Sequence, residues 1–213
     1  MKMTFKNIAD YVYDYLFEKI ANDNLIPEQK IDIDAICVEL GVSRTPVKEA
    51  LIYLGMEGYL EKLPRRGYVV RKLTPNTFVE LLACLGTLEG MAASLAVPQI
   101  KEPELIVMKK NVEEMGCAIQ NKDQNKYFEL QKDFHEIFIS CCGNDELKKL
   151  IIFLNKRFFK QDYKMHKSND ELYEALKKIN EEHRQIILLL EKGDKAGLEK
   201  FLREVHWVSH IAG

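Results

Sequence analysis

Gly41-Val42-Ser43-Arg44-Thr45-Pro46-Val47-Lys48-Glu49-Ala50-Leu51 is the stretch that decides the fold of the first part of this chain. Gly41 permits the positive φ that ends a preceding helix, and Ser43 is a favourable N-cap for the next one. Pro46 falls within the first turn of that helix, where its missing N–H does no harm. The stretch therefore predicts a tight turn followed by a helix that begins at about Ser43.

The predicted helix has an apolar face and a polar N-terminal edge. Val47, Leu51 and Leu54 share one face at helical spacing and are predicted to lie in a core. The residues that point elsewhere are Ser43, Arg44, Thr45 and Lys48. This is the layout of the second helix of a helix-turn-helix, whose N-terminal residues contact base edges in the major groove. An ordinary helical hairpin with a solvated basic edge is the alternative that this stretch leaves open.

The flanking sequence favours a winged helix-turn-helix. Apolar residues at helical spacing predict helices over about 5–21 and 34–40, ahead of the motif helix. Two β-rich runs, 59–63 and 68–72, predict a hairpin directly after it. The turn between them carries two cations and a glycine that lets the backbone approach a phosphate or the minor groove: Arg65, Arg66 and Gly67. A hairpin in this position is a wing, although a solvated turn would show the same residues.

Charge is distributed unevenly along the chain. The formal net charge of the whole chain is −2, which by itself indicates no nucleic-acid partner. Residues 1–40 carry four basic and eight acidic residues, a net of −4. Residues 41–73 carry seven basic and three acidic residues, a net of +4, and they include the predicted motif helix and wing. This is the local electrostatic footprint expected of a DNA-binding surface.

The remainder of the chain is predicted to be entirely helical. Thr74-Pro75 marks the expected boundary between a domain over 1–73 and a domain over 74–213. The helices predicted in the second domain span about 76–97, 103–121, 123–142, 145–165, 169–192 and 195–210. Four of their starts carry capping residues, namely Asp123, Asn144, Ser168 and Asp194. The expected fold class is mainly α: three helices with a β-hairpin wing, followed by an all-α antiparallel helical bundle.

Composition points to a protein of the cytoplasm. Hydrophobic residues make up 46% and charged residues 30% of the 213 residues, as is usual for globular proteins. The five cysteines are odd in number and form no C-x-x-C motif, and no apolar segment opens the chain. We therefore expect reduced, mostly buried thiols. The purely apolar runs are too short to span a bilayer, so no membrane association is expected.

At this point the chain resembles the GntR family of bacterial transcription regulators. The resemblance lies in the 41–51 stretch, in Leu54 and Glu57-Gly58, and in the wing sequence Pro64-x-x-Gly67 with Val69. The helical part is similar, more loosely, to the ligand-sensing domain of the FCD subfamily. Its marks are Leu88-Glu89-Gly90, Phe134-His135, Gly143-Asn144-x-x-Leu147, Glu182-His183 and Gly193-Asp194.

The resemblance implies a homodimer that binds a short palindromic operator in double-stranded DNA. The positions that match the family's DNA contacts are Ser43, Arg44, Thr45, Lys48, Arg66 and Gly67, with Arg65 beside them at the wing tip. Arg44 suits bidentate recognition of a guanine. Lys48 stands where the family usually has arginine and lacks the planar fork. A further basic contact of the family falls on Asp34, whose charge would repel phosphate.

The resemblance also implies a site for a divalent metal, a small carboxylate, or both. His135 and His183 match two of the family's histidine ligands. Gln131 stands where the family has an aspartate one turn before the first histidine, so it would coordinate without adding charge. The third histidine position falls on Val205, with His206 next to it, and a small shift in the preceding turn would bring His206 into line. Zinc or nickel suits imidazole better than magnesium or calcium does.

An organic effector is the alternative to a metal in the same cavity. Arg157 flanks an apolar stripe and could pair with the carboxylate of such a ligand, although a solvated arginine is an equally simple interpretation. Two further possibilities stay open: a helical domain that only dimerises, and a metalloenzyme built on His135 and His183. We find no general base, nucleophile motif or phosphate loop for the latter, so we do not expect an enzyme.

Overall fold

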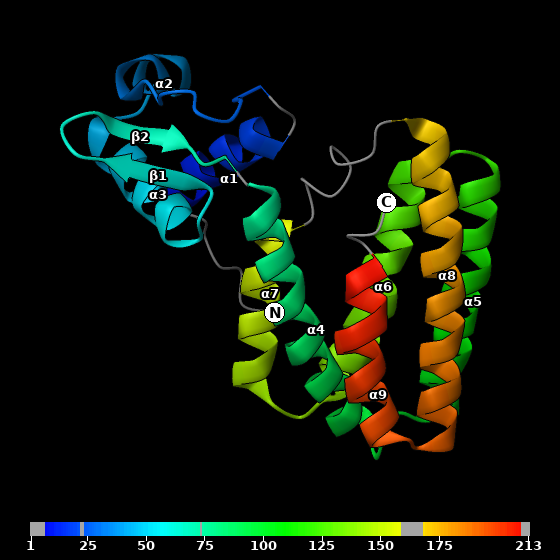
Figure 1. Ribbon diagram of the computed structural model, residues 1–213. Helices are drawn as coiled ribbons and strands as arrows, with labels where there is room; N and C mark the ends of the chain where they lie inside the picture. Colours follow the sequence, from blue (N-terminus) through cyan, green and yellow to red (C-terminus); the bar gives the residue numbers. More distant parts are fainter. Residues whose placement is uncertain (1–6, 22–23, 73, 159–167, 210–213) are drawn as a thin grey trace. The chain divides into compact units, whose positions relative to one another are not determined.

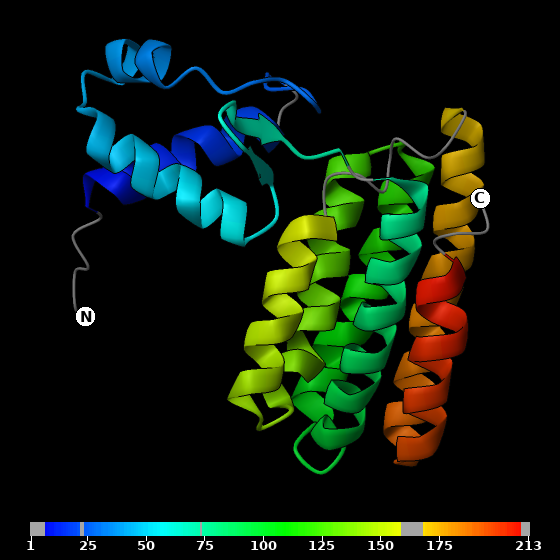
Figure 2. The same ribbon diagram turned by 60° about the vertical axis from the view of Figure 1, so that its left-hand side comes forward.

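The computed structural model describes residues 7–21, 24–72, 74–158 and 168–209, and the chain divides into two compact units, Met1–Thr74 and Pro75–Gly213. Figures 1 and 2 show the two units from two directions. The division falls next to the Thr74-Pro75 boundary expected from the sequence. The predicted fold class is confirmed: helices with a β-hairpin wing, then a helical domain.

The N-terminal unit consists of three helices and a two-stranded antiparallel sheet. Its helices are α1 (Ile8–Ala21), α2 (Ile33–Leu40) and α3 (Arg44–Met56), and its strands are β1 (Leu60–Leu63) and β2 (Gly67–Val70). The strands pair with Leu60 opposite Val70 and Leu63 opposite Gly67. The segment before α2 runs beside β2, where Ile31 donates its N–H to the carbonyl of Tyr68 at 2.9 Å. Lys30 forms an isolated antiparallel bridge with Val69 in the same segment.

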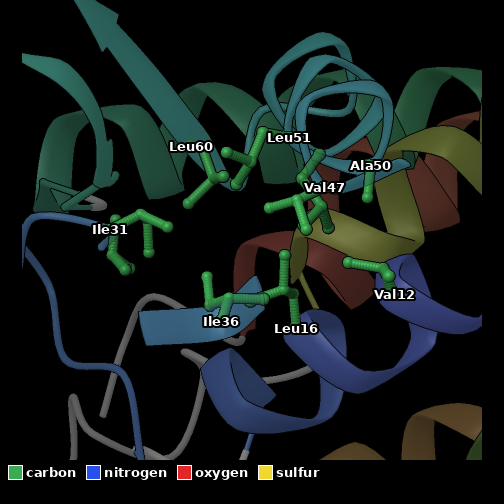
Figure 3. Close-up of a cluster of buried hydrophobic side chains, with 10 residues drawn as sticks. Val12, Leu16, Ile31, Ile36, Val47, Ala50, Leu51 and Leu60 are labelled. Carbon is green, nitrogen blue, oxygen red and sulfur yellow. The ribbon is translucent and has the colours of Figure 1, made fainter. Parts of the chain in front are cut away.

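One apolar cluster holds this unit together (Figure 3). The predicted core face of α3 is confirmed, because Val47, Leu51 and Leu54 are fully buried. Figure 3 shows side chains of α1, α2, α3 and β1 converging on this cluster. Each buried aliphatic side chain of this size stabilises the fold by about 1.5–3 kcal/mol. The cluster thereby anchors α3 and leaves its N-terminal edge outside.

A polar contact supports the same arrangement at the far end of α3. The hydroxyl of Tyr13 on α1 donates a hydrogen bond to the carboxylate of Glu57, the C-cap residue of α3. Burial, followed by the bond to Glu57, raises the pKa of the Tyr13 phenol well above its usual value. The phenol therefore remains a proton donor across the physiological pH range.

The C-terminal unit is a bundle of long helices. They are α4 (Pro75–Ala96), α5 (Glu102–Gln120), α6 (Gln124–Cys141), α7 (Asp145–Phe158), α8 (Asn169–Lys192), α9 (Lys195–Phe201), a π-helix η2 (Leu202–His206) and α10 (Trp207–Ser209). The predicted caps are confirmed, since the side chains of Asp123, Asn144, Ser168 and Asp194 each accept a backbone N–H three residues on. Helices α5 and α8 pack against each other and lie side by side in Figure 1. The predicted extension of α7 to residue 165 lies outside the described residues.

The expectation of mostly buried thiols is wrong. Of the five cysteines only Cys142 is buried, and Cys84 and Cys117 are exposed.

Helix α4 is long and apolar enough to cross a membrane, with a mean hydropathy of 1.5 over its most apolar stretch. However, 56% of that stretch is buried inside the unit, and core helices of soluble proteins meet the same criterion.

Candidate DNA-binding surface and candidate metal centre

The N-terminal edge of α3 is exposed and basic. Ser43 is the N-cap residue, but its hydroxyl makes no capping bond, and Pro46 contributes no N–H to the first turn. The amides at a helix N-terminus, with their partial positive charge, favour an anion such as a phosphate. The exposed side chains on this edge are those of Ser43, Arg44, Thr45 and Lys48. The edge predicted from the sequence is therefore accessible to a ligand.

The wing tip is exposed as well. Pro64, Arg65, Arg66 and Gly67 form a tight turn, closed by a bond of 3.2 Å from the Arg66 N–H to the Leu63 carbonyl. Arg65 has a φ of +61°, which is uncommon for a residue with a Cβ, and Gly67 has a φ of +84°. The left-handed backbone at Arg65 costs about 1–2 kcal/mol. The turn thus exposes two arginines to solvent.

Arg44 has a partner that the sequence did not reveal. Its Nε donates to Oδ1 of Asp34 at 2.8 Å, and its Nη2 donates to Oδ2 at 2.7 Å. Both side chains are 65% exposed. Asp34 thus contacts the arginine that is expected to read DNA, in a fork of two charge-assisted hydrogen bonds.

Three histidines meet in the interior of the C-terminal unit. His135 of α6, His183 of α8 and His206 of η2 are 5%, 0% and 0% exposed. The Nε2 atom of His135 lies 3.2 Å from Nε2 of His183 and 3.3 Å from Nε2 of His206. The cluster qualifies as a potential metal site by the spacing of its ligand atoms.

Two buried carboxylates orient these imidazoles. Oε2 of Glu89 on α4 lies 2.7 Å from Nδ1 of His135 and accepts a bond of 3.1 Å from the indole N–H of Trp207. Oε2 of Glu182 lies 3.1 Å from Nδ1 of His206. A carboxylate at Nδ1 favours the tautomer with its proton there, which leaves the Nε2 lone pair available. The lone pairs of His135 and His206 therefore face each other and His183.

The converging Nε2 atoms fit a site that holds a metal ion better than a packed core without one. Neighbouring lone pairs repel unless a proton or a cation lies between them. In a tetrahedral zinc site with Zn–N bonds of 2.0–2.1 Å, two nitrogen ligands lie about 3.3 Å apart, close to the separations found here. A divalent ion would also balance the charges of Glu89 and Glu182. The donor set of three neutral imidazoles suits zinc, copper or nickel.

A π-helical turn brings His206 into this cluster. Val205, at the expected third position, is 41% exposed, whereas His206 is fully buried. Because η2 is a π-helix, it contains more residues per turn than an α-helix and shifts the following side chains around the axis. The shift considered from the sequence is therefore present, and His206 rather than Val205 faces inward.

The close approach of η2 to α4 depends on a glycine. A Cβ placed on Gly86 would lie 3.0 Å from the Cα of Arg203 and 3.0 Å from the carbonyl oxygen of Leu202. Both contacts are with backbone atoms, which cannot move aside as a flexible side chain can. Gly86 thus sets the distance between the helix that carries Glu89 and the turn that carries His206.

We expect Gly86→Ala to destabilise the C-terminal unit by about 1–3 kcal/mol, as overpacking commonly does, and to displace η2 so that metal binding weakens. Urea unfolding and the metal content of the purified variant measure the two effects. Gly116→Ala is the control, because a Cβ on Gly116 meets only the Asn180 side chain, at 3.7 Å. Equal stability of the two variants would contradict the role given to Gly86.

The other predicted site residues are placed as follows. Gln131 lies on α6 one turn before His135 and is 5% exposed, so it is on the same buried face. The backbone of Arg157 belongs to α7, and its side chain lies outside the described part of the chain. Leu88-Glu89-Gly90 and Glu182-His183 are recognisable in the sequence as family marks, but no sequence signal indicates that their carboxylates orient the imidazoles. Trp207, the single tryptophan, is a further partner of Glu89 that no sequence signal indicates.

Comparison with known families identifies both units. Residues 8–70 match the bacterial regulatory proteins of the gntR family, and residues 80–206 match the FCD domain. The chain belongs to the gntR family and carries an FCD domain. The match is to a family of transcription regulators and not of enzymes, as expected from the sequence.

Individual transcription regulators are similar to this chain at a moderate level. The HTH-type transcriptional regulator YdhC of Bacillus subtilis is 30% identical over 144 residues, 67% of this chain and 64% of that protein. The HTH-type transcriptional repressor RspR of Escherichia coli is 26% identical over 130 residues, 61% of this chain and 57% of that protein. The chain thus spans less than two thirds of the length of either relative.

Solved structures share the fold. E. coli McbR/YncC superposes with a TM-score of 0.69 at 21% identity, over 97% of this chain and 94% of that one. A structure described as "Lar controls the expression of the Listeria monocytogenes agr system and mediates virulence" superposes with a TM-score of 0.63 at 23% identity, over 98% of this chain and 97% of that one. At these identities the comparison supports the architecture of this gntR-family protein and nothing finer.

Proposed function

We propose that this gntR-family protein is a cytoplasmic, sequence-specific DNA-binding regulator of transcription, most simply a repressor. In this proposal a homodimer binds a short palindromic operator, with the N-terminal edge of α3 in the major groove and the wing on the flanking backbone or minor groove. The single observation that carries this proposal is the exposed basic edge of Ser43, Arg44, Thr45 and Lys48, held outside by a fully buried opposite face. The positive charge of residues 41–73 supports it.

We further propose that the FCD unit senses a divalent metal held by His135, His183 and His206. The support is the convergence of Nε2 atoms at 3.2 and 3.3 Å, backed by Glu89 and Glu182 at the Nδ1 atoms. Zinc or nickel is the proposed ion, and Gln131 is a fourth ligand candidate through its amide oxygen. The bound ion would supply a Lewis-acidic position for the carboxylate of an effector, with Arg157 as a candidate charge partner.

In this proposal the chain's own residues provide a buried and pre-oriented site. Glu89 and Glu182 hold the imidazoles, and Trp207 and the phenylalanines of α6 exclude water from around them. Ligand binding would favour one relative placement of the two N-terminal DNA-binding units of the dimer over another. An operator with two half-sites at fixed spacing would then be bound or released as a consequence.

Two measurements on the wild-type protein test the proposal. Selection from a random duplex library is expected to yield a palindromic consensus that binds much more tightly than random DNA, and more weakly at higher salt. Elemental analysis of protein purified without chelator is expected to find zinc or nickel at about one equivalent per chain. A protein that selects no sequence contradicts the first part, and a metal-free protein that binds neither added ion contradicts the second.

A further inference from the structure

The contact between Asp34 and Arg44 does not belong to the fold's core, and it lies on the surface proposed to bind DNA. Asp34 is the second residue of α2, and Arg44 is the first residue of α3. The two are ten residues apart in sequence and come together because Gly41 turns the chain between the helices with a φ of +64°. The pair therefore joins the two helices of the helix-turn-helix at its DNA-facing edge.

The geometry of the pair leaves the recognition edge of the arginine available. A guanidinium has five N–H donors in a fixed plane. Asp34 occupies the donor on Nε and one on Nη2, at 2.8 and 2.7 Å. Three donors remain, and two of them, the second on Nη2 and the adjacent one on Nη1, form the outer edge of the guanidinium plane. That edge matches the O6 and N7 acceptors of a guanine, which a bidentate arginine reads in the major groove.

Asp34 also changes the electrostatics of the same edge. A carboxylate that is 65% exposed on a DNA-facing edge repels phosphates. It therefore opposes non-specific binding, which depends almost entirely on cation–phosphate contacts. By holding the guanidinium in one plane, it also reduces the rotamer entropy that Arg44 would lose on contacting a base.

We propose that Asp34 is a specificity-determining residue that positions Arg44 for one guanine in each operator half-site. Asp34 does not itself contact the base in this proposal; it acts through Arg44. An exposed ion pair contributes little to stability, so the pair is expected to affect DNA selectivity rather than folding. The inference rests on the proposed DNA-binding function.

The test uses the full-length protein, the consensus operator selected by the wild type, and duplexes with each base pair of a half-site replaced in turn. The variant is Asp34→Asn, which keeps the size of the side chain and removes its charge. Glu49→Gln is the matched control, because it removes the same charge from an exposed position of α3, the helix that carries Arg44. Affinities are measured at two salt concentrations, and circular dichroism verifies the fold of each variant.

For Asp34→Asn we expect the ratio of operator to random-DNA affinity to fall about tenfold, with most of the loss at one guanine position. For Glu49→Gln we expect affinity for all duplexes to rise together and the ratio to stay the same. In an Arg44→Lys background, Asp34→Asn is expected to cause no further loss of base discrimination. This coupling is a readout that a general effect of charge or folding would not produce.

Two outcomes overturn the inference, and they are distinguishable. If Asp34→Asn behaves like Glu49→Gln, strengthening binding to every duplex and keeping base discrimination, then Asp34 is only a repulsive surface charge. If the wild type selects no sequence at all, the proposed DNA-binding function fails, and the inference fails with it.

Discussion

His183→Ala is expected to leave the purified protein without its metal, whereas the wild type retains about one equivalent. His183 is fully buried, and its Nε2 atom lies 3.2 Å from Nε2 of His135. Removing one of three imidazoles leaves two, and with the neutral amide of Gln131 at most three ligands, fewer than the four of the closed sites in which zinc is retained through purification. Elemental analysis of both proteins, expressed and purified without chelator, measures the difference.

The same variant should lose the stabilisation that metal provides. A ligand at one hundred times its dissociation constant stabilises the native state by about 2.7 kcal/mol, which corresponds to a shift in Tm of about 5–10 °C for a protein of this size. We expect added zinc or nickel to raise the Tm of chelator-treated wild type by this amount and to leave His183→Ala unchanged. Thermal unfolding of both proteins in chelator shows whether the variant folds. A somewhat lower Tm of the variant is expected there, because truncation of His183 leaves a cavity in the core.

Position 206 offers a sharper version of this experiment. His206→Ala should abolish metal binding, whereas Val205→Ala, a change at the adjacent and partly exposed residue, should preserve it. Moving the imidazole with Val205→His in the His206→Ala background should not restore binding, because η2 directs position 205 outward. Restored binding in that double variant would contradict the π-helical register, and metal retained in His206→Ala would contradict the ligand assignment.

Arg44→Ala is expected to abolish the preference for the operator over random DNA. The arginine stands at the first position of α3, where the recognition helix of a helix-turn-helix contacts base edges. Loss of a bidentate arginine–guanine contact costs about 1–3 kcal/mol in each half-site, and a homodimer has two half-sites. Operator affinity should therefore fall by about 30- to 20,000-fold, while affinity for random DNA falls much less.

Arg65→Ala is the matched control for that experiment. Arg65 is an exposed cation of the same unit at the wing tip, outside the recognition helix. Its loss should weaken binding to operator and random DNA alike and reduce the salt dependence of both, as expected when a phosphate contact is removed. Titrations at several salt concentrations separate the two behaviours. Equal losses on operator and random DNA for Arg44→Ala would refute its assignment as the residue that reads bases.

Local signals made the N-terminal unit predictable. The turn at Gly41, the cap position at Ser43 and the buried face of Val47, Leu51 and Leu54 depend on residues within one or two turns of each other. The helix ends of the C-terminal unit are predictable from local signals as well. Gly143 and Gly193 have positive φ, and the predicted capping residues accept the expected backbone N–H groups. Such local preferences indicate where helices begin and end, without reference to how the helices pack.

The sequence by itself determined a positively charged helix-turn-helix with a wing and a following helical bundle, and its resemblance to the FCD subfamily pointed to His135 and His183 as metal ligands. Only the tertiary structure decided that His206 joins them in place of Val205, that Glu89 and Glu182 orient the imidazoles, and that Asp34 holds Arg44. Each of these depends on groups that packing brings together across 10 to 71 residues of sequence. The π-helical register of η2 in particular accompanies its close packing against Gly86, and neither helical periodicity nor capping signals carry that information.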